Sequence, residues 1–226
     1  MNYKRHEQKY ICSAYQIEHL LKILPSILQV DSHQKGPSYH VKSLYFDTQN
    51  NRFLSESLNG IPKRLKYRLR QYEGDNENFK FECKSSFLNL KQKRFVWVKK
   101  KDLDTILDEK TPNNLSKEDL INEFYCLKKT ESLKPKLIID YDRAAFVHEA
   151  LNVRITLDKN ITQSDETDLF FDNSYLRKNI LEDNAGILEV KFDDVLPAYI
   201  RHILGLEELN QTSFSKYVMG RTTHKY

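Results

Sequence analysis

The segment Lys66-Tyr-Arg-Leu-Arg-Gln-Tyr72 alternates basic or polar side chains with apolar or aromatic ones, and Phe79-Lys-Phe-Glu-Cys-Lys84 repeats that alternation. Successive side chains of a strand point to opposite faces, so each segment predicts a strand with one charged face and one apolar face. Between them, Gly74-Asp75 followed by Asn76-Glu-Asn78 is typical of a hairpin turn. The two segments therefore predict an antiparallel hairpin with a strongly charged face.

The same period of two recurs along the chain and predicts about eight strands. They cover residues 4–11, 39–46, 63–72, 79–85, 91–98, 135–143, 152–158 and 186–193. Between the strands, Ser13 is expected to cap a helix that runs to about Leu28, and Ser116 is expected to begin a second helix. A third helix is expected at 198–204, and a helical turn at 213–217.

The composition describes an ordinary globular protein with a mild basic excess. The chain has 226 residues, 39% hydrophobic residues and a formal net charge of +4, and no Gly/Ser/Pro-rich linker divides it, so we expect one domain over 1–226. No apolar stretch reaches the length of a membrane span, and no signal peptide is visible. The three cysteines are widely spaced, which argues against a disulfide framework. These features predict a soluble, cytoplasmic protein.

The charged faces of the strands point to function more directly than the net charge does. Lys and Arg recur at alternate positions in at least four strands, in three of them with a Glu. Exposure to water would explain each face taken alone. Taken together, the faces suggest either an open basic sheet for nucleic acid or a barrel with its charges turned inward around an anionic ligand. Tyr67, Tyr72, Phe79 and Phe81 are assigned to the faces opposite the charges, which favours a core beneath helices over nucleic-acid binding. We therefore predict an α+β fold with flanking helices, in which an antiparallel eight-stranded barrel would enclose the ligand and an open sheet is the alternative.

Eight short motifs, in order along nearly the whole chain, resemble the polyphosphate-polymerase domain of the vacuolar transporter chaperone (VTC) family. That family belongs to the triphosphate tunnel metalloenzymes, the CYTH-like superfamily. The motifs are Arg5–Tyr10, Ser43–Thr48, Lys66–Tyr72, Phe81–Lys84, Tyr141–Phe146, Val153–Asp158, Leu188–Lys191 and Phe214–Tyr217. The resemblance implies a tunnel that binds ATP, a triphosphate or polyphosphate, with Mg²⁺ or Mn²⁺ as cofactor and no nucleic acid as partner. It also allows a partner protein in a membrane.

The resemblance assigns roles to residues at the matching positions. Catalytic side chains would be Arg68, Arg70, Arg143, Arg154 and Lys84. Substrate would also be bound by Lys9, Lys93, Tyr141, Lys191, Ser215 and Lys216, where Lys93 represents the stretch from Lys91 to Arg94. Glu189 would be the main metal ligand, with Glu7 and Glu82 nearby.

The implied activity is that of a phosphotransferase which moves the γ-phosphate of ATP onto a growing polyphosphate. A metal-dependent triphosphatase and a non-catalytic binder of polyphosphate or triphosphate are the alternatives. The superfamily opens with Glu-x-Glu-x-Lys, but Arg5 replaces the first Glu, which disfavours simple hydrolysis. Ser213 stands where eukaryotic members often have Lys. Trp97 is expected to pack beneath a helix, and Cys83 to belong to the core.

Overall fold

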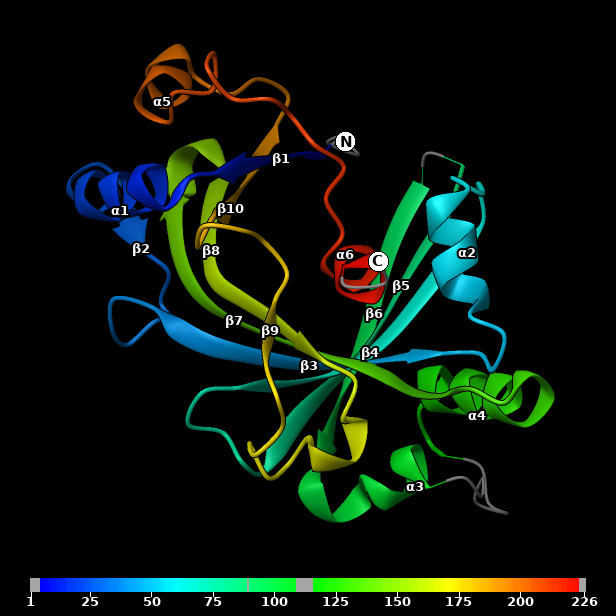
Figure 1. Ribbon diagram of the computed structural model, residues 1–226. Coiled ribbons are helices and arrows are strands. Elements are labelled where there is room, and N and C mark those ends of the chain that lie inside the picture. The colour runs from blue at the N-terminus through cyan, green and yellow to red at the C-terminus, as the bar shows by residue number, and fades with distance from the viewer. Residues whose placement is uncertain (1–4, 89, 109–115, 224–226) are drawn as a thin grey trace. The chain divides into compact units, whose positions relative to one another are not determined.

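The computed structural model describes residues 5–88, 90–108 and 116–223 (Figure 1). The chain forms two compact units, each assembled from separate segments. Unit 1 comprises Met1–His40, Asp140–Thr162 and Asn179–Ser215. Unit 2 comprises Val41–Ile139, Gln163–Lys178 and Lys216–Tyr226. The single domain expected over 1–226 stays a prediction.

Eight strands follow one hydrogen-bonded order, β1-β10-β8-β7-β3-β4-β5-β6. Their bounds are β1 Arg5–Cys12, β3 Tyr39–Asp47, β4 Arg64–Tyr72, β5 Asn78–Phe87, β6 Leu90–Lys99, β7 Lys134–His148, β8 Val153–Ser164 and β10 Gly186–Asp193. Two short strands lie off this order, since β2 (Gln29–Val30) pairs with β7 and β9 (Lys178–Asn179) with β8. The expected strands and the α+β class are confirmed. In the described part of the chain the order ends at β1 and β6, so the sheet is not the closed barrel that we expected.

The described residues also form six α-helices and four short 3-10 turns. The helices are α1 Ala14–Ile23, α2 Arg52–Leu58, α3 Asp104–Leu107, α4 Asp119–Glu131, α5 Ala198–Ile203 and α6 Lys216–Thr222. The 3-10 turns are Leu24–Ser26, Lys100–Asp102, Glu149–Leu151 and Thr167–Leu169. Ser13 caps α1 as predicted, in a capping box with Gln16. The helix ends before Leu28 because Pro25 lacks the N–H that a continuing α-helix needs.

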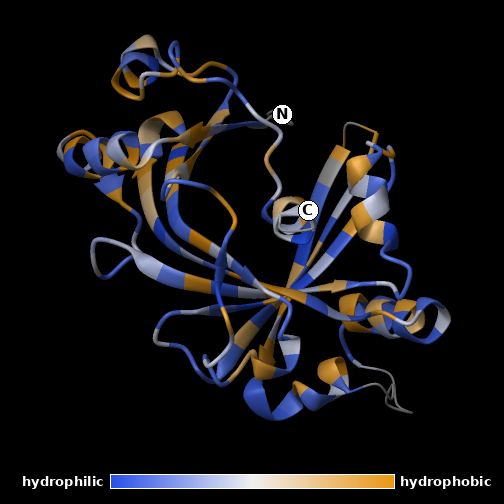
Figure 2. Ribbon diagram, in the orientation of Figure 1, coloured by the Kyte–Doolittle hydropathy of each residue, from blue (hydrophilic) through white to orange (hydrophobic). Residues whose placement is uncertain are grey.

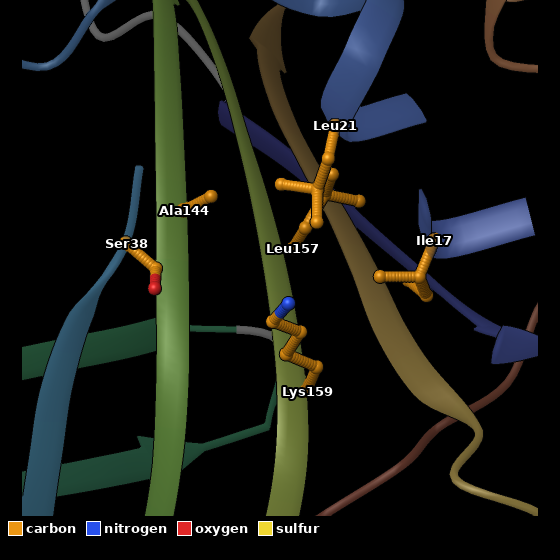
Figure 3. A pocket seen from close by; sticks show the side chains of 6 residues that line it. All are labelled: Ile17, Leu21, Ser38, Ala144, Leu157 and Lys159. Atoms are coloured by element: carbon orange, nitrogen blue, oxygen red, sulfur yellow. The ribbon is translucent and has the colours of Figure 1, made fainter. Parts of the chain in front are cut away.

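Helix α1 covers one face of the strands in unit 1. Ile17 and Leu21 pack against Ala144 of β7 and Leu157 of β8, and the space between them is too small for a water molecule (Figure 3). Leu188 and its apolar neighbours on β10 are buried in the same core. Because side chains alternate along a strand, the other face of β10 presents charged residues.

The core of unit 2 is aromatic and lies beneath α4. The ring of Phe124 on α4 is 5.1 Å from Phe46, 5.4 Å from Tyr67 and 4.9 Å from Phe81, measured between centroids. Cys83 is buried in this core, as predicted. Figure 2 shows hydrophobic and hydrophilic residues alternating along the strands. The strands of unit 2 thus bury their apolar face against α4, and their charged side chains lie on the opposite face.

A buried carboxylate, Asp47 at the end of β3, fixes two helices of unit 2. Its oxygens accept hydrogen bonds from the backbone N–H groups of Phe53 (2.9 Å) and Leu54 (3.1 Å) at the start of α2. They also accept one from the hydroxyl of Tyr217 on α6, at 2.5 Å. Gly220 lets α6 approach β7 closely, because a Cβ at that position would lie only 2.8 Å from the side chain of Ile139 on β7. These contacts set the position of Lys216, the first residue of α6.

Candidate functional site

A fully buried carboxylate lies at the centre of the charged face in unit 2. Glu82 of β5 stands opposite Arg68 of β4 in the antiparallel register. Arg68 Nε donates to Glu82 Oε2 at 2.5 Å, and Arg70 Nη1 lies 3.8 Å from the same oxygen. Lys93 of β6 forms an ion pair with the other oxygen. We call Arg68, Arg70, Glu82 and Lys93 the arginine cluster, a set of three cations around one carboxylate.

The pKa values in this region report a positive potential. The pKa of Glu82 lies well below its usual range because Arg68, Arg70 and Lys93 outweigh the opposing effect of burial. Burial would raise the pKa of Tyr45, but Arg68, Arg70 and Lys216 lower it below its ordinary value. Arg68 Nη1 donates to the Tyr45 hydroxyl at 3.2 Å. The ring of Tyr217 on α6 lies 5.2 Å from the ring of Tyr45, measured between centroids, so α6 packs beside the residue that Arg68 contacts.

Neighbouring lysines extend the charged face, and the structure distinguishes the basic residues of β6. Lys84 stands opposite Lys66 on β4 and opposite Lys93 on β6. Arg94 points the other way, because its guanidinium pairs with Glu123 of α4 at 2.7 and 2.5 Å. Lys93 is therefore the residue of this stretch that reaches the charged face, while the side chain of Lys91 lies outside the described residues.

In unit 1 the predicted residues of β1 and β10 alternate in sign. Lys9 stands opposite Glu189, and Glu7 opposite Lys191. Lys9 Nζ lies 3.0 Å from Glu7 Oε1 and 3.8 Å from Glu189 Oε2, and Lys191 Nζ lies 2.5 Å from Glu189 Oε1. Burial opposes ionisation of Glu189, but Lys191, Lys9 and Arg143 hold its pKa well below its usual range. We call Glu7, Lys9, Glu189 and Lys191 the glutamate cluster.

The two predicted arginines of unit 1 are each held by a carboxylate that the sequence analysis did not assign to the site. Arg143 of β7 binds Asp158 of β8 through two hydrogen bonds, Nε to Oδ1 at 2.7 Å and Nη2 to Oδ2 at 2.8 Å. Its guanidinium also lies 5.1 Å from the ring centroid of Tyr141. Arg154, which stands opposite Lys191, forms an ion pair with Asp31. The residues Asp31 and Asp158 therefore orient the arginines.

The remaining predicted residue, Ser215, is half-buried and precedes α6. The main-chain oxygen of the residue before it, Phe214, accepts a hydrogen bond from Lys9 Nζ at 3.3 Å. The structure thus distributes the predicted residues between the two units. Unit 1 holds Glu7, Lys9, Tyr141, Arg143, Arg154, Glu189, Lys191 and Ser215. Unit 2 holds Arg68, Arg70, Glu82, Lys84, Lys93 and Lys216.

The three predicted metal ligands differ in their surroundings. Among the described residues, no group of three His, Cys, Asp or Glu side chains is placed to hold a metal ion. Glu7 and Glu189 are neighbours, because Lys9 Nζ lies 3.0 Å from one and 3.8 Å from the other. Burial and the charge of Glu189 raise the pKa of Glu7, but Lys9 and Lys191 hold it below its ordinary value. Two carboxylates suit Mg²⁺, which takes further ligands from phosphates and water. Glu82, enclosed by three cations, is instead suited to holding the arginines in place.

Comparisons with known proteins agree with this structure. The model of the family described as "VTC domain" matches residues 4–225, whereas no curated protein matches the chain. A Bacillus halodurans protein, provisionally named an adenylate cyclase, is 17% identical with a TM-score of 0.57, and the match covers 92% of each chain. A protein of Pyrococcus horikoshii is 13% identical with a TM-score of 0.50, over 96% of this chain and 97% of that one. At these identities the solved structures show a common fold.

No helix in the described ranges is both long and apolar enough to span a membrane. The resemblance inferred from the eight motifs is confirmed, because the family model covers the same motifs from the first strand to the last helix. The chain belongs to the VTC domain family.

Proposed function

We propose that this protein is a polyphosphate polymerase-like phosphotransferase, which moves the γ-phosphate of ATP onto a growing polyphosphate chain. The observation that carries the proposal is the arginine cluster, in which three cations lie around one buried carboxylate. Family membership supports it, because Arg68, Arg70 and Glu82 of the cluster lie in two of the motifs that carry the resemblance. The lowered pKa of Tyr45 supports the same conclusion, since it reports positive charge that an anion would neutralise.

Arginine is suited to this task because its planar guanidinium can donate to two phosphate oxygens at once. Arg68 and Arg143 are each held by a buried carboxylate, so their orientation is fixed before the ligand arrives. Such preorganised donors stabilise the charge that develops in phosphoryl transfer without reorganising. The carboxylates therefore contribute by positioning the arginines.

In this proposal cations in each unit bind phosphate groups. In unit 2 these cations are Arg68, Arg70 and Lys84, and in unit 1 they are Arg143 and Arg154. A terminal phosphate oxygen of the growing chain attacks the γ-phosphorus, a new P–O bond forms, and the bond to the leaving ADP breaks. Weaker contacts to the phosphates come from Lys9, Lys93, Tyr141, Lys191, Ser215 and Lys216.

Glu7 and Glu189 would hold the divalent cation, Mg²⁺ or Mn²⁺, because they are the two neighbouring carboxylates of the glutamate cluster. When bound, the cation would neutralise negative charge on the phosphates. Lys9 and Lys191 already form ion pairs with these carboxylates. In the proposal their ammonium groups turn from the carboxylates toward phosphate oxygens, while the backbone of each strand stays where it is. If water replaces the terminal phosphate as the attacking group, the same site is a triphosphatase.

A turnover assay with the variant Glu189→Gln tests the proposal. Purified protein is incubated with ATP, Mn²⁺ and a short phosphate primer, and ADP, free phosphate and polymer are quantified separately. We expect ADP and polymer from the native protein and roughly 100-fold slower turnover from the variant. The variant should still bind tripolyphosphate, because the substitution removes a negative charge and no cation. Glu18→Gln is a matched control, since Glu18 pairs with Lys159 on the exposed side of α1.

Each other outcome contradicts the proposal in a different way. Free phosphate in amounts equal to ADP, without polymer, identifies a triphosphatase. Binding of tripolyphosphate without turnover under any divalent ion identifies a binding module. Equal turnover in Glu189→Gln and the native protein shows that Glu189 only balances the charge of Lys191 and Lys9.

A further inference from the structure

Two aromatic side chains of β6 lie exposed on the charged face of unit 2. Phe95 is 48% exposed and Trp97 55% exposed. The prediction that Trp97 packs beneath a helix is wrong, because Val96 and Val98 are the residues of this segment that contact the core. Trp97 stands opposite Lys80 of β5, and Lys80 in turn stands opposite Arg70 of β4.

A continuous series of contacts joins these rings to the arginine cluster. Lys80 Nζ lies 3.8 Å from the ring centroid of Phe95 and 5.3 Å from that of Trp97. The ring of Tyr72 lies 6.5 Å from Trp97 at an angle of 49°. The hydroxyl of Tyr72 accepts a hydrogen bond from Arg70 Nη1 at 3.4 Å. The exposed rings of Phe95 and Trp97 therefore lie next to the arginine cluster, with Tyr72 and Lys80 between them.

Tyr72 also differs from what the sequence predicted. It was assigned to the face opposite the charges, but its contact with Arg70 places it on the charged face. Positive charge from Arg70 lowers the pKa of Tyr72, although burial works against this shift. Three aromatic rings, of Tyr72, Phe95 and Trp97, thus share a face with the cations. We call Phe95 and Trp97, with Lys80 between them, the aromatic platform.

An exposed tryptophan beside a cluster of cations has a specific chemical use. Nucleobases stack on aromatic side chains, while cations nearby bind the attached phosphates. Burial of large aromatic rings is favourable, so a ligand that covers Phe95 and Trp97 gains affinity from area that the folded chain leaves in water. Inorganic tripolyphosphate has no aromatic ring, so it cannot gain affinity by covering Phe95 and Trp97.

We infer that the aromatic platform binds the base of a nucleoside triphosphate whose phosphates contact the arginine cluster. This inference rests on the proposed function and adds a preference for nucleoside triphosphates over inorganic tripolyphosphate. Lys80 stands at the junction, opposite both Trp97 and Arg70, and places a cation between base and phosphates. Stacking does not depend on hydrogen-bonding groups of the base, so ATP and GTP should bind alike, and both more tightly than pyrimidine nucleotides.

The chain supplies its own reporter, because Trp97 is its only tryptophan. ATP should quench the fluorescence of Trp97, and adenosine at higher concentration should do the same, whereas tripolyphosphate should leave most of the emission unchanged. Calorimetric titration of Trp97→Ala and Phe95→Ala should show roughly tenfold weaker ATP binding, as expected for the loss of one base stack. Tripolyphosphate should bind these variants as tightly as it binds the native protein.

Two controls separate stacking from damage to the fold. Trp97→Phe keeps a ring at the same place and should recover most of the affinity for ATP. Tyr15→Ala removes an exposed aromatic side chain from α1 and should change neither affinity. The unfolding curve of each variant is recorded alongside its titration.

Equal weakening of ATP and tripolyphosphate in Trp97→Ala, or no change in either, overturns the platform while the proposed function stands. Failure of the native protein to bind either ligand overturns both. If a single-stranded RNA oligonucleotide quenches Trp97 and ATP does not, the surface is a nucleic-acid interface and the inference is wrong.

Discussion

The charged clusters of the two units differ in how cations and carboxylates are matched. In unit 1 each predicted cation lies against a carboxylate. The pairs are Lys9 with Glu7, Lys191 with Glu189, Arg143 with Asp158 and Arg154 with Asp31. In unit 2 the arginine cluster gathers Arg68, Arg70 and Lys93 around Glu82.

This difference suggests a division of labour between the clusters. Pairing one cation with one carboxylate limits repulsion before any ligand binds, and it leaves carboxylates that a divalent metal can use. Three cations around one carboxylate repel each other in a partly buried site, and a phosphate relieves that repulsion. We therefore expect phosphate affinity to depend mainly on unit 2 and metal dependence mainly on unit 1.

The largest expected effect is that of Glu82→Gln on stability. The substitution leaves half-buried Arg68 and buried Arg70 without the carboxylate that now contacts them, a type of change that costs about 3–5 kcal/mol. Tripolyphosphate supplies negative charge and should restore much of the loss. Urea unfolding with and without tripolyphosphate measures both effects.

Glu7→Gln is the matched control in unit 1. Its partner Lys9 also contacts Glu189, and both side chains are partly exposed, so the cost should stay below about 1 kcal/mol. Similar losses in the two variants, or a Glu82→Gln protein that tripolyphosphate fails to stabilise, would contradict the division of labour.

A second prediction compares removal of one cation from each cluster. Arg70→Ala should weaken tripolyphosphate binding roughly 10- to 100-fold, as expected for the loss of a charged hydrogen bond, and equally with and without Mn²⁺. Lys191→Ala takes from Glu189 its nearest cation, and the exposed negative charge should repel phosphate. Because Mn²⁺ can neutralise that charge, it should recover most of the affinity of Lys191→Ala. Both variants are titrated with tripolyphosphate, with and without Mn²⁺. If Mn²⁺ changes the affinity of both variants equally, the two clusters do not differ in their dependence on the metal.

Most of the fold could be predicted because the strands carry a clear period of two. Helix α2 could not, since its start has no adjacent capping side chain, and Asn51 before it takes a left-handed conformation with φ of 57°. The helix begins instead because Asp47, several residues earlier, accepts hydrogen bonds from Phe53 and Leu54. A long-range cap of this kind leaves no local pattern in the sequence.

The site was predicted in part for a related reason. Alternation indicates which residues of one strand share a face, and it grouped Arg68 with Arg70 correctly. It does not give the register between strands, which decides that Glu82 meets Arg68 and that Trp97 meets Lys80. The two residues that join Phe87 to Leu90 in the sequence include no glycine, so no local pattern there indicates how β5 and β6 pair.

His40 of unit 1 supplies the test with the smallest expected effect. There two carboxylates contact one imidazole, which is the opposite of three cations around one carboxylate in unit 2. Its Nε2 lies 3.2 Å from Asp140 Oδ1 and its Nδ1 lies 3.1 Å from Asp142 Oδ1, so two carboxylates contact one imidazole. The hydrogen bond to Asp140, together with that to Asp142, raises the pKa of His40 above 6.5, although burial opposes the shift. Asn160 Nδ2 also donates to Asp142, at 2.7 Å.

A raised pKa means that the folded protein favours the protonated imidazole. The resulting stabilisation is complete below pH 6.5, the ordinary value, and is lost as the pH rises through the pKa of the folded state. Since His40 is partly exposed, the loss should stay below about 1 kcal/mol. Urea unfolding across this range should show the decline in the native protein and in the control His148→Asn, and a flatter profile in His40→Asn. If His40→Asn declines as steeply as the native protein, the two aspartates do not stabilise the protonated form of His40.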